Sequence, residues 1–111
     1  MKFKLQPRFL DQVDNIIEEN LDNESFSTED LSALLCLSSS QVSRKIKQQT
    51  GLTTSEYIRN TRLDYAKKLI EDSELRLSEI TFMVGFSRLS YFSRCFSNHF
   101  GFPPSSLRYQ S

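Results

Sequence analysis

Apolar side chains recur every three or four residues along most of this chain, which is the spacing of amphipathic helices. The first such stripe covers residues 8–21 and includes Val13 and Ile17. The longest covers about 53–71 and includes Ile58, Leu63 and Ala66. Glycine and proline number three each, which is few for an all-β protein with many turns. The pattern predicts an all-α fold.

Polar residues between the stripes predict where helices begin. Ser27, Ser38 and Thr53 each have an acidic residue or Gln three positions later, the pattern of a capping box at a helix N-terminus. Arg76 stands where a fourth such residue is expected, so the helix after it lacks an obvious side-chain cap. We therefore expect helices to start after residues 27, 38, 53 and 76.

Residues 80–109 have the outline of a helix-turn-helix. A short helix is predicted first, with Ile80, Met83 and Val84 on its inner side, and Gly85 then predicts a tight turn because glycine takes positive φ at no steric cost. A second helix follows and ends at Gly101. Pro103–Pro104 excludes its continuation but suits the first turn of a further short helix. This second helix carries an aromatic stripe that we interpret as core rather than a platform for stacking bases: Phe92, Phe96 and Phe100.

The same outline occurs about fifty residues upstream, so the chain contains an internal repeat. Matching positions lie forty-nine apart before Tyr91 and fifty apart after it. The aligned pairs include Leu31 with Ile80, Leu37 with Phe86, Val42 with Phe92, Arg44 with Arg94 and Gly51 with Gly101. We therefore predict seven helices in a homeodomain-like arrangement. Two helix-turn-helix units, over about 27–51 and 76–101, are joined by a long central helix over about 53–71.

Length and composition place the chain among single-domain proteins. Its 111 residues are 38% hydrophobic and 25% charged. No apolar run has membrane-spanning length, and the first ten residues lack the apolar core of a secretion signal. These features predict a cytoplasmic location and no membrane contact.

The residue types that carry catalysis or metal binding are scarce. Cys36 and Cys95 are isolated, and no Cys/His spacing suits a metal site, so we expect reduced structural thiols. His99 is the only histidine and has no acidic or cysteine neighbour in sequence. The sequence therefore predicts no enzyme activity, no cofactor and no metal.

Charge is distributed unevenly although the formal net charge is zero. Residues 1–36 carry three basic and eight acidic side chains, whereas residues 37–111 carry eleven basic and six acidic ones. Such asymmetry is typical of a domain with an interaction surface on one part. We expect the acidic face of the first helix to point away from any nucleic acid, although two ordinary solvated faces also explain the charges.

Two long motifs resemble the AraC/XylS family of bacterial transcription regulators. From Ile80 to Pro104 the sequence reads I-x-x-x-V-G-F-S-x-x-S-Y-F-S-R-x-F-x-x-x-x-G-x-x-P. The upstream E-D-L…S-x-S-Q-V-S-R-K-I-K…T-G-L-T-T-S-E-Y-I-R-x-x-R-L-x-x-A resembles the family's first repeat. The resemblance covers about residues 8–109 and leaves residues 1–7 as an arm or linker remnant. The run Ser-Tyr-Phe-Ser-Arg-Cys-Phe, within the Ile80–Pro104 motif, also resembles the DNA-binding ends of hybrid two-component regulators.

The sequence departs from the family pattern at the first unit. Cys36 occupies the turn position that Gly85 fills in the second unit, so we expect a strained backbone that costs roughly 1 kcal/mol. Ser39, Ser40 and Ser43 are short where many relatives carry longer side chains. We therefore expect the second unit to supply more of the sequence specificity.

The resemblance implies DNA contacts at the two recognition helices. Arg44 and Arg94 are the best candidates for reading bases, because a guanidinium group can bond two acceptors on guanine. Leu89 has two interpretations, packing on a thymine methyl group or a core contact. Arg59, Arg62, Lys67 and Lys68 of the central helix are expected to be solvated or bridging rather than bound to phosphate. The predicted DNA-binding residues are Ser39, Ser40, Gln41, Ser43, Arg44, Lys47, Arg88, Leu89, Ser90, Ser93 and Arg94.

The resemblance also implies a mechanism and partners. Two recognition helices would enter successive major-groove segments of double-stranded DNA, so that one monomer reads an asymmetric site of about 20 bp. Activation is the expected outcome, with RNA polymerase as a candidate partner and a regulatory or sensor region expected in a longer protein. A free-standing small regulator remains an alternative. So does a helical protein-interaction module that binds no specific DNA.

Overall fold

The computed structural model describes residues 8–108, so the arm expected at 1–7 lies outside the described residues. The described part is all-helical and contains no strand, which confirms the predicted fold class. The seventh predicted helix is a short 3-10 helix, η1. The elements are α1 (Phe9–Glu19), α2 (Thr28–Leu35), α3 (Ser39–Thr50), α4 (Thr54–Asp72), α5 (Leu77–Met83), α6 (Leu89–Phe100) and η1 (Pro104–Arg108).

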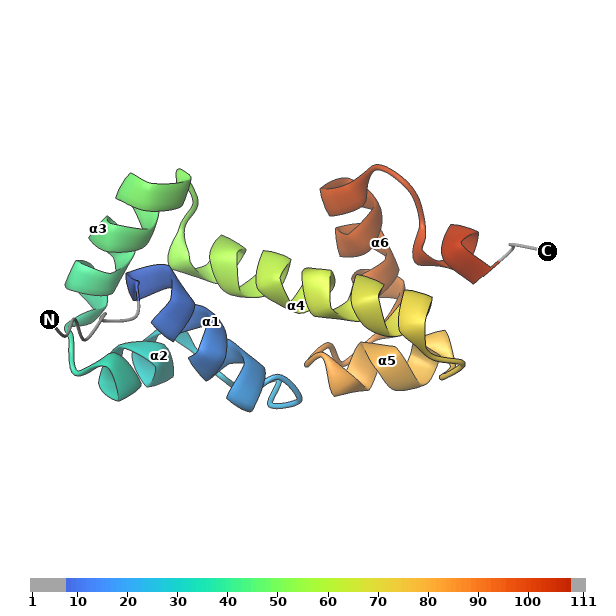
Figure 1. Cartoon of the computed structure of the whole chain (residues 1–111), viewed down its shortest axis with the longest axis horizontal. Helices are drawn as coiled ribbons and strands as arrows, with labels where there is room; N and C mark the ends of the chain where they lie inside the picture. The colour runs from blue at the N-terminus through green and yellow to red at the C-terminus, as the bar shows by residue number, and fades with distance from the viewer. Residues whose placement is uncertain (1–7, 109–111) are drawn as a thin grey trace, which may run out of the picture.

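The long helix α4 is the spine of the molecule, which measures 51 × 35 × 23 Å along its principal axes. Figure 1 shows α1, α2 and α3 around the first half of α4, and α5, α6 and η1 around the second half. The two predicted helix-turn-helix units are therefore present, α2–α3 and α5–α6. They share α4 as the predicted central helix.

Each half of α4 completes a separate hydrophobic core. The first unit's core consists of Val13, Ile17, Phe26, Leu31, Val42, Ile46 and Ile58. The second unit's core consists of Leu63, Ala66, Ile70, Ile80, Val84, Phe86, Phe92 and Phe96. Leu21, at the start of the loop that follows α1, packs against both cores. The aromatic stripe of α6 is confirmed as core, since Phe92 and Phe96 are fully buried and Phe100 packs against them.

The predicted capping boxes are confirmed. Ser27, Ser38 and Thr53 each accept a hydrogen bond from the backbone N–H three residues later, at 3.1–3.2 Å. The side chains at those later positions accept in return from the backbone N–H of the capping residue, at 2.9 Å. Arg76 makes no side-chain cap bond, as predicted, although Glu79 accepts from its backbone N–H at 3.3 Å. Local sequence therefore defines where these four helices begin.

The two turns between paired helices have the same hydrogen-bond geometry. Cys36 has φ 58° and Gly85 has φ 86°, both in the left-handed region. The residue after each turn donates its N–H to a carbonyl five residues earlier, Leu37 to Ser32 at 3.1 Å and Phe86 to Thr81 at 3.0 Å. This pairing is the Schellman motif that ends many helices. The strained conformation predicted for Cys36 is confirmed.

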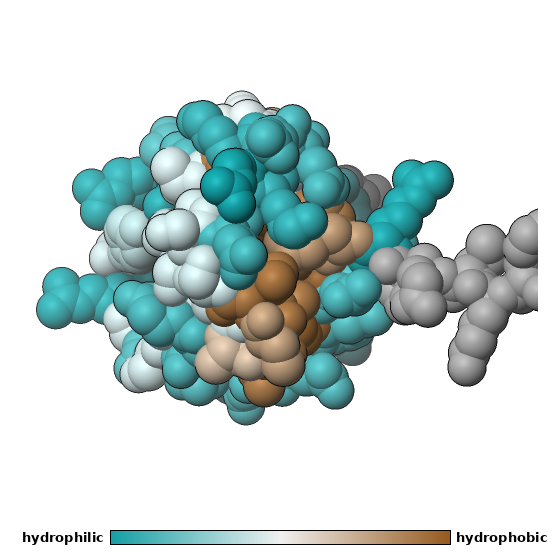
Figure 2. Space-filling model, turned by 90° about the vertical axis from the view of Figure 1, so that its left-hand side faces the viewer, coloured by the Kyte–Doolittle hydropathy of each residue, from teal (hydrophilic) through white to brown (hydrophobic). Residues whose placement is uncertain are grey.

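One predicted inward side chain points outward instead. Met83 is 41% exposed, whereas Ile80 and Val84 are fully buried. Residues three and four positions after Ile80 lie about 100° apart around a helix, so only one of them faces the core. Leu34, the equivalent residue of the first unit, is also exposed. Figure 2, which looks onto the end of the molecule formed by the first unit, shows a mostly hydrophilic surface with one apolar patch.

We predict that Cys36→Gly raises the free energy of unfolding by about 0.5–1 kcal/mol, because glycine adopts the left-handed conformation without a steric penalty. Cys36 is exposed, so little packing is lost. Cys36→Ala keeps the Cβ atom and is the matched control, with little change expected. Urea unfolding followed by circular dichroism measures both. Equal effects of the two substitutions would show that the turn is not strained.

Candidate nucleic-acid interface

The recognition helices α3 and α6 have the same length and present a polar face opposite the core. Each has 12 residues and follows directly on the left-handed turn of its unit. Val42 and Ile46 anchor α3, while Phe92 and Phe96 anchor α6. Figure 1 shows both helices extending to the same side of α4. Their polar faces are therefore available to one extended partner.

The six predicted residues of α3 are all exposed: Ser39, Ser40, Gln41, Ser43, Arg44 and Lys47. Gln41 also serves the cap, because its Oε1 accepts from the Ser38 N–H at 2.9 Å. The Ser43 hydroxyl lies 3.3 Å from the Thr54 hydroxyl at the start of α4. Arg44 has no hydrogen bond or ion pair with any residue in the range 8–108 that the structure describes. Its guanidinium group is therefore free to bind a partner.

The five predicted residues of α6 lie at and after its N-terminus. Arg88, Leu89, Ser90 and Arg94 are exposed, and Ser93 is partly buried. Leu89 is 42% exposed, which excludes the core interpretation for this side chain. Arg88 occupies the N-cap position without a side-chain cap bond. The N-cap and first half of α6 therefore present two arginines and one apolar side chain outward.

Tyr91 belongs to this surface although the sequence did not single it out. The Arg94 guanidinium lies over the Tyr91 ring, 5.5 Å from the ring centroid. The Tyr91 ring lies 5.9 Å from that of Phe86, which itself contacts Phe92 at 5.4 Å between ring centroids. A cation–π contact at this distance holds the guanidinium near one position. The sequence does contain a signal for this contact, because Tyr91 and Arg94 are three residues apart and such pairs are neighbours on a helix.

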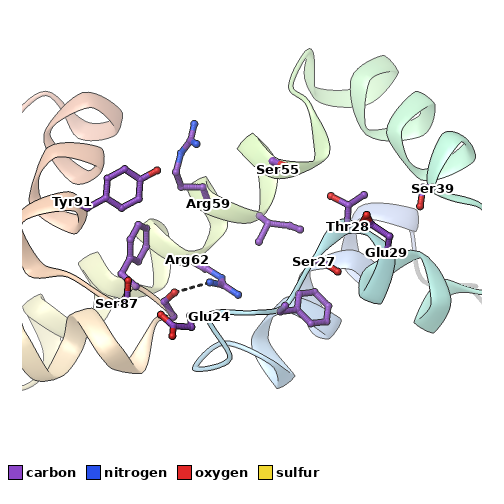
Figure 3. A pocket seen from close by; sticks show the side chains of 14 residues that line it. Glu24, Ser27, Thr28, Glu29, Ser39, Ser55, Arg59, Arg62, Ser87 and Tyr91 are labelled. Atoms are coloured by element: carbon purple, nitrogen blue, oxygen red, sulfur yellow. Dashed lines mark hydrogen bonds between the residues drawn. The ribbon is translucent and has the colours of Figure 1, made fainter.

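A cleft of about 590 Å³ separates the starts of the two recognition helices. Figure 3 shows Ser39 of α3 and Tyr91 of α6 on either side, with Ser55 and Arg59 of α4 between them. Arg59 is partly buried and has no hydrogen bond or ion pair among the described residues. The positive charge of Arg59 therefore lies on the same face as the recognition helices. The sequence predicts only a solvated or bridging role for this residue.

The other basic residues of α4 have different surroundings. Lys67 forms an ion pair with Glu71 at 3.0 Å, and Lys68 is exposed. Arg62 is only 7% exposed and donates hydrogen bonds to two backbone carbonyl groups, so it is the bridging residue among them. Burial lowers the pKa of Arg62. Its side chain is unavailable to phosphate.

The acidic helix α1 is attached to α4 by a carboxylate contact. Tyr57 donates from its hydroxyl group to Asp14 at 2.6 Å. Burial and this carboxylate raise the pKa of Tyr57, since both disfavour the phenolate form. The hydroxyl therefore stays a hydrogen-bond donor at neutral pH.

Residues 8–108 contain no group of three His, Cys, Asp or Glu side chains placed to hold a metal ion. Cys36 and Cys95 are free cysteines, as expected. His99, without an acidic neighbour in sequence, lies 3.0 Å from Asp64 of α4 through its Nε2 atom. No helix in this range is long and apolar enough to cross a membrane.

Two helix-turn-helix units on a shared helix, each with an exposed basic recognition helix, define a class of DNA-binding transcription regulators. A family model described as "Helix-turn-helix domain" matches residues 31–110. The chain belongs to the AraC/XylS family of helix-turn-helix regulators. This family consists of transcription regulators and is not a class of enzymes.

Individual relatives agree with this assignment. The chain is 38% identical to a probable transcriptional regulator, LumQ of Photobacterium leiognathi, over 88% of this chain and 38% of that protein. It is 35% identical to a histidine kinase of Formosa agariphila, over 94% of this chain and 8% of that protein. A transcriptional regulator with an AraC-type DNA-binding domain from Chromobacterium violaceum superposes with a TM-score of 0.81 at 30% identity, covering 87% of this chain and 86% of that one. The chain thus spans well under half the length of LumQ and of the histidine kinase.

We predict that Tyr91→Leu lowers the affinity for a specific DNA site about threefold, the equivalent of the 0.5–1 kcal/mol typical of an exposed cation–π contact. Leucine keeps an apolar contact with Phe86 but has no aromatic face for Arg94. Fluorescence anisotropy with labelled duplex measures the affinity. In an Arg94→Ala background the same substitution should have little further effect. A gain in affinity would show instead that Tyr91 holds Arg94 away from DNA.

Proposed function

We propose that this chain binds DNA sequence-specifically by inserting α3 and α6 into successive major-groove segments. The observation that carries the proposal is that the two exposed basic helix faces lie on the same side of α4 (Figure 1). The net positive charge of residues 37–111, which include both helices, supports it. Helix-turn-helix readers place two such helices about one DNA turn, or roughly 10 bp, apart. One monomer would therefore read an asymmetric site of about 20 bp.

The side chains divide by what they are suited to bind. Arg44 and Arg94 are suited to guanine, because a guanidinium group can pair with two acceptors at its major-groove edge. Lys47, Arg88 and Arg59 are suited to phosphates, which fix the register of the protein on the duplex. Leu89 is exposed and suited to a thymine methyl group. The remaining proposed contacts are hydroxyl and amide groups at the helix starts, from Ser39, Ser40, Gln41, Ser43, Ser90 and Ser93.

The separation of the two recognition helices determines whether the bound DNA must bend. If the two recognition helices are closer together than successive major-groove segments of straight DNA, the duplex must bend to meet both. The cost of bending depends on sequence, so bases between the two contacted segments would also affect affinity. Arg59 and Ser55 in the cleft would then face the sugar–phosphate backbone that crosses between the helices (Figure 3).

The wider role follows from the family and remains part of the proposal. Residues 8–109 form one AraC-type DNA-binding domain, with units at about 27–51 and 76–101 and residues 1–7 as an arm or linker. The domain works within a longer regulator, as in the relatives of which it spans a minor part. Activation through RNA polymerase is the proposed outcome. Similarity to a histidine kinase supports a role in a two-component system. A DNA-binding role implies a cytoplasmic location. We assign no catalytic activity to the chain.

Selection of bound duplexes from a random pool tests the proposed function directly. We expect recovery of one asymmetric motif of about 20 bp, with two conserved segments roughly 10 bp apart. Binding to mixed-sequence DNA should be weaker and fall steeply with salt, because phosphate contacts release counterions. Failure to bind DNA at low salt would favour a protein-interaction module instead.

We predict that Arg94→Ala weakens binding to the selected site by about 1–3 kcal/mol and relaxes the base preference at one position. Lys68→Ala is the matched control, because it removes one positive charge from an exposed position of α4 beside the second unit and away from the cleft. The control should change affinity little. Anisotropy titrations against the selected site and its single-base variants measure both effects. Equal losses from the two substitutions would contradict this docking.

A further inference from the structure

The two helix-turn-helix units have separate cores, so their relative position needs an explanation. Each unit packs on its own half of α4, and among the described residues only Leu21 packs against both cores. Figure 1 shows the loop after α1 reaching toward the start of the turn that follows α5. A contact at this place is therefore able to fix one unit against the other.

Arg62 makes that contact from the middle of α4. Its Nη1 atom donates to the Gly85 carbonyl at 2.9 Å, within the turn of the second unit. Its Nη2 atom donates to the Asn23 carbonyl at 2.8 Å, within the loop after α1. The same carbonyl accepts from the Phe26 N–H at 3.0 Å, so it lies in an ordered turn. One guanidinium group thus joins the central helix to a loop of each unit.

The surroundings of this guanidinium group limit how the contact can be replaced. Arg62 is 7% exposed, and no carboxylate lies within ion-pair distance of it in the described part of the chain. Its Nε atom is buried without a hydrogen-bond partner. A planar fork with two separate donors spans both carbonyl groups, which an ammonium group does less well. A buried charge held only by carbonyl groups is costly, so stability alone does not account for it.

Gly85 is fitted to the same contact. A Cβ atom at this position would overlap the Arg62 guanidinium and lie 2.6 Å from the Leu21 carbonyl oxygen. The second unit's turn therefore approaches both Arg62 and the loop of the first unit more closely than any other residue type allows. The equivalent residue of the first unit, Cys36, has an exposed side chain.

We propose that Arg62 sets the separation and relative rotation of α3 and α6, and thereby determines which spacing between the two halves of a DNA site the protein accepts. This inference rests on the proposed two-helix docking. Each added base pair moves the second half-site by about 3.4 Å along the duplex and rotates it by about a tenth of a turn. A rigid pair of recognition helices rejects such a change. A pair joined by α4 alone tolerates it better.

A spacing series tests the role of Arg62 in specificity. The selected site is rebuilt with one or two base pairs inserted or deleted between its halves, and affinities are measured for the natural chain and its variants. The natural chain should lose about tenfold for a shift of one base pair, whereas Arg62→Met should lose threefold or less. Arg62→Lys should fall between them. An unchanged spacing profile in Arg62→Met would overturn the proposal.

Arg59→Met is the matched control, since it removes the same charge three residues earlier on α4 from a side chain without a hydrogen bond or ion pair in the described chain. It should lower affinity for all spacings by a similar factor and leave the profile unchanged. Circular dichroism and thermal unfolding verify that each variant is folded. Should Arg62→Met fail to fold, the comparison of Arg62→Lys with the natural chain still decides the question.

A distance measurement without DNA separates this inference from the proposed function. Spin labels at the exposed residues Gln48 of α3 and Asn98 of α6, in a chain with Cys36→Ser and Cys95→Ser, report the separation of the two helices by double electron–electron resonance. We expect one narrow distribution, broadened or shifted by Arg62→Met. Identical distributions would overturn the inference. Absence of DNA binding with a broadened distribution would overturn the proposed function alone.

Discussion

The structure depends on one constraint: two separate cores share a single helix, and each includes side chains from one half of it. Ile58 completes the first core, and Leu63, Ala66 and Ile70 complete the second. A helix of 19 residues is about 28 Å long, enough to carry one unit on each half. The same helix that stabilises both units therefore also determines how far apart they lie. The packing of both units on α4 therefore also determines how α3 and α6 are placed relative to each other.

This constraint also explains why the recognition helices present basic residues outward. The two apolar residues of α3, Val42 and Ile46, both belong to the first core. Arg44 and Lys47 lie on the other face, are exposed, and have no hydrogen bond or ion pair among the described residues. On α6, the bulkier Phe92 and Phe96 form the anchor instead. Burial of one face leaves the other face available for DNA.

Local features could be predicted from the sequence, whereas contacts between distant segments could not. Capping boxes and the left-handed Cys36 follow from residue types at fixed spacings and from the alignment of Cys36 with Gly85. In the sequence, Arg62 cannot be distinguished from the other basic residues of the central helix. Its partners are the carbonyl groups of Asn23 and Gly85, which lie 39 and 23 residues away in the chain. Backbone carbonyl groups leave no sequence signature. The proposed DNA contacts rest on exposure and position, and the structure adds Tyr91 and Arg59 to that surface.

The two units differ in how firmly they hold their reading side chains. In the second unit, Arg94 lies over Tyr91, and Tyr91 contacts Phe86 of the core. In the first unit, Leu37 replaces Phe86 by repeat alignment, and Arg44 has no aromatic neighbour of this kind among the described residues. A side chain ordered before binding loses less conformational entropy when it meets DNA. We therefore propose that the second unit discriminates bases more strongly than the first, whose Arg44 is surrounded by short serines.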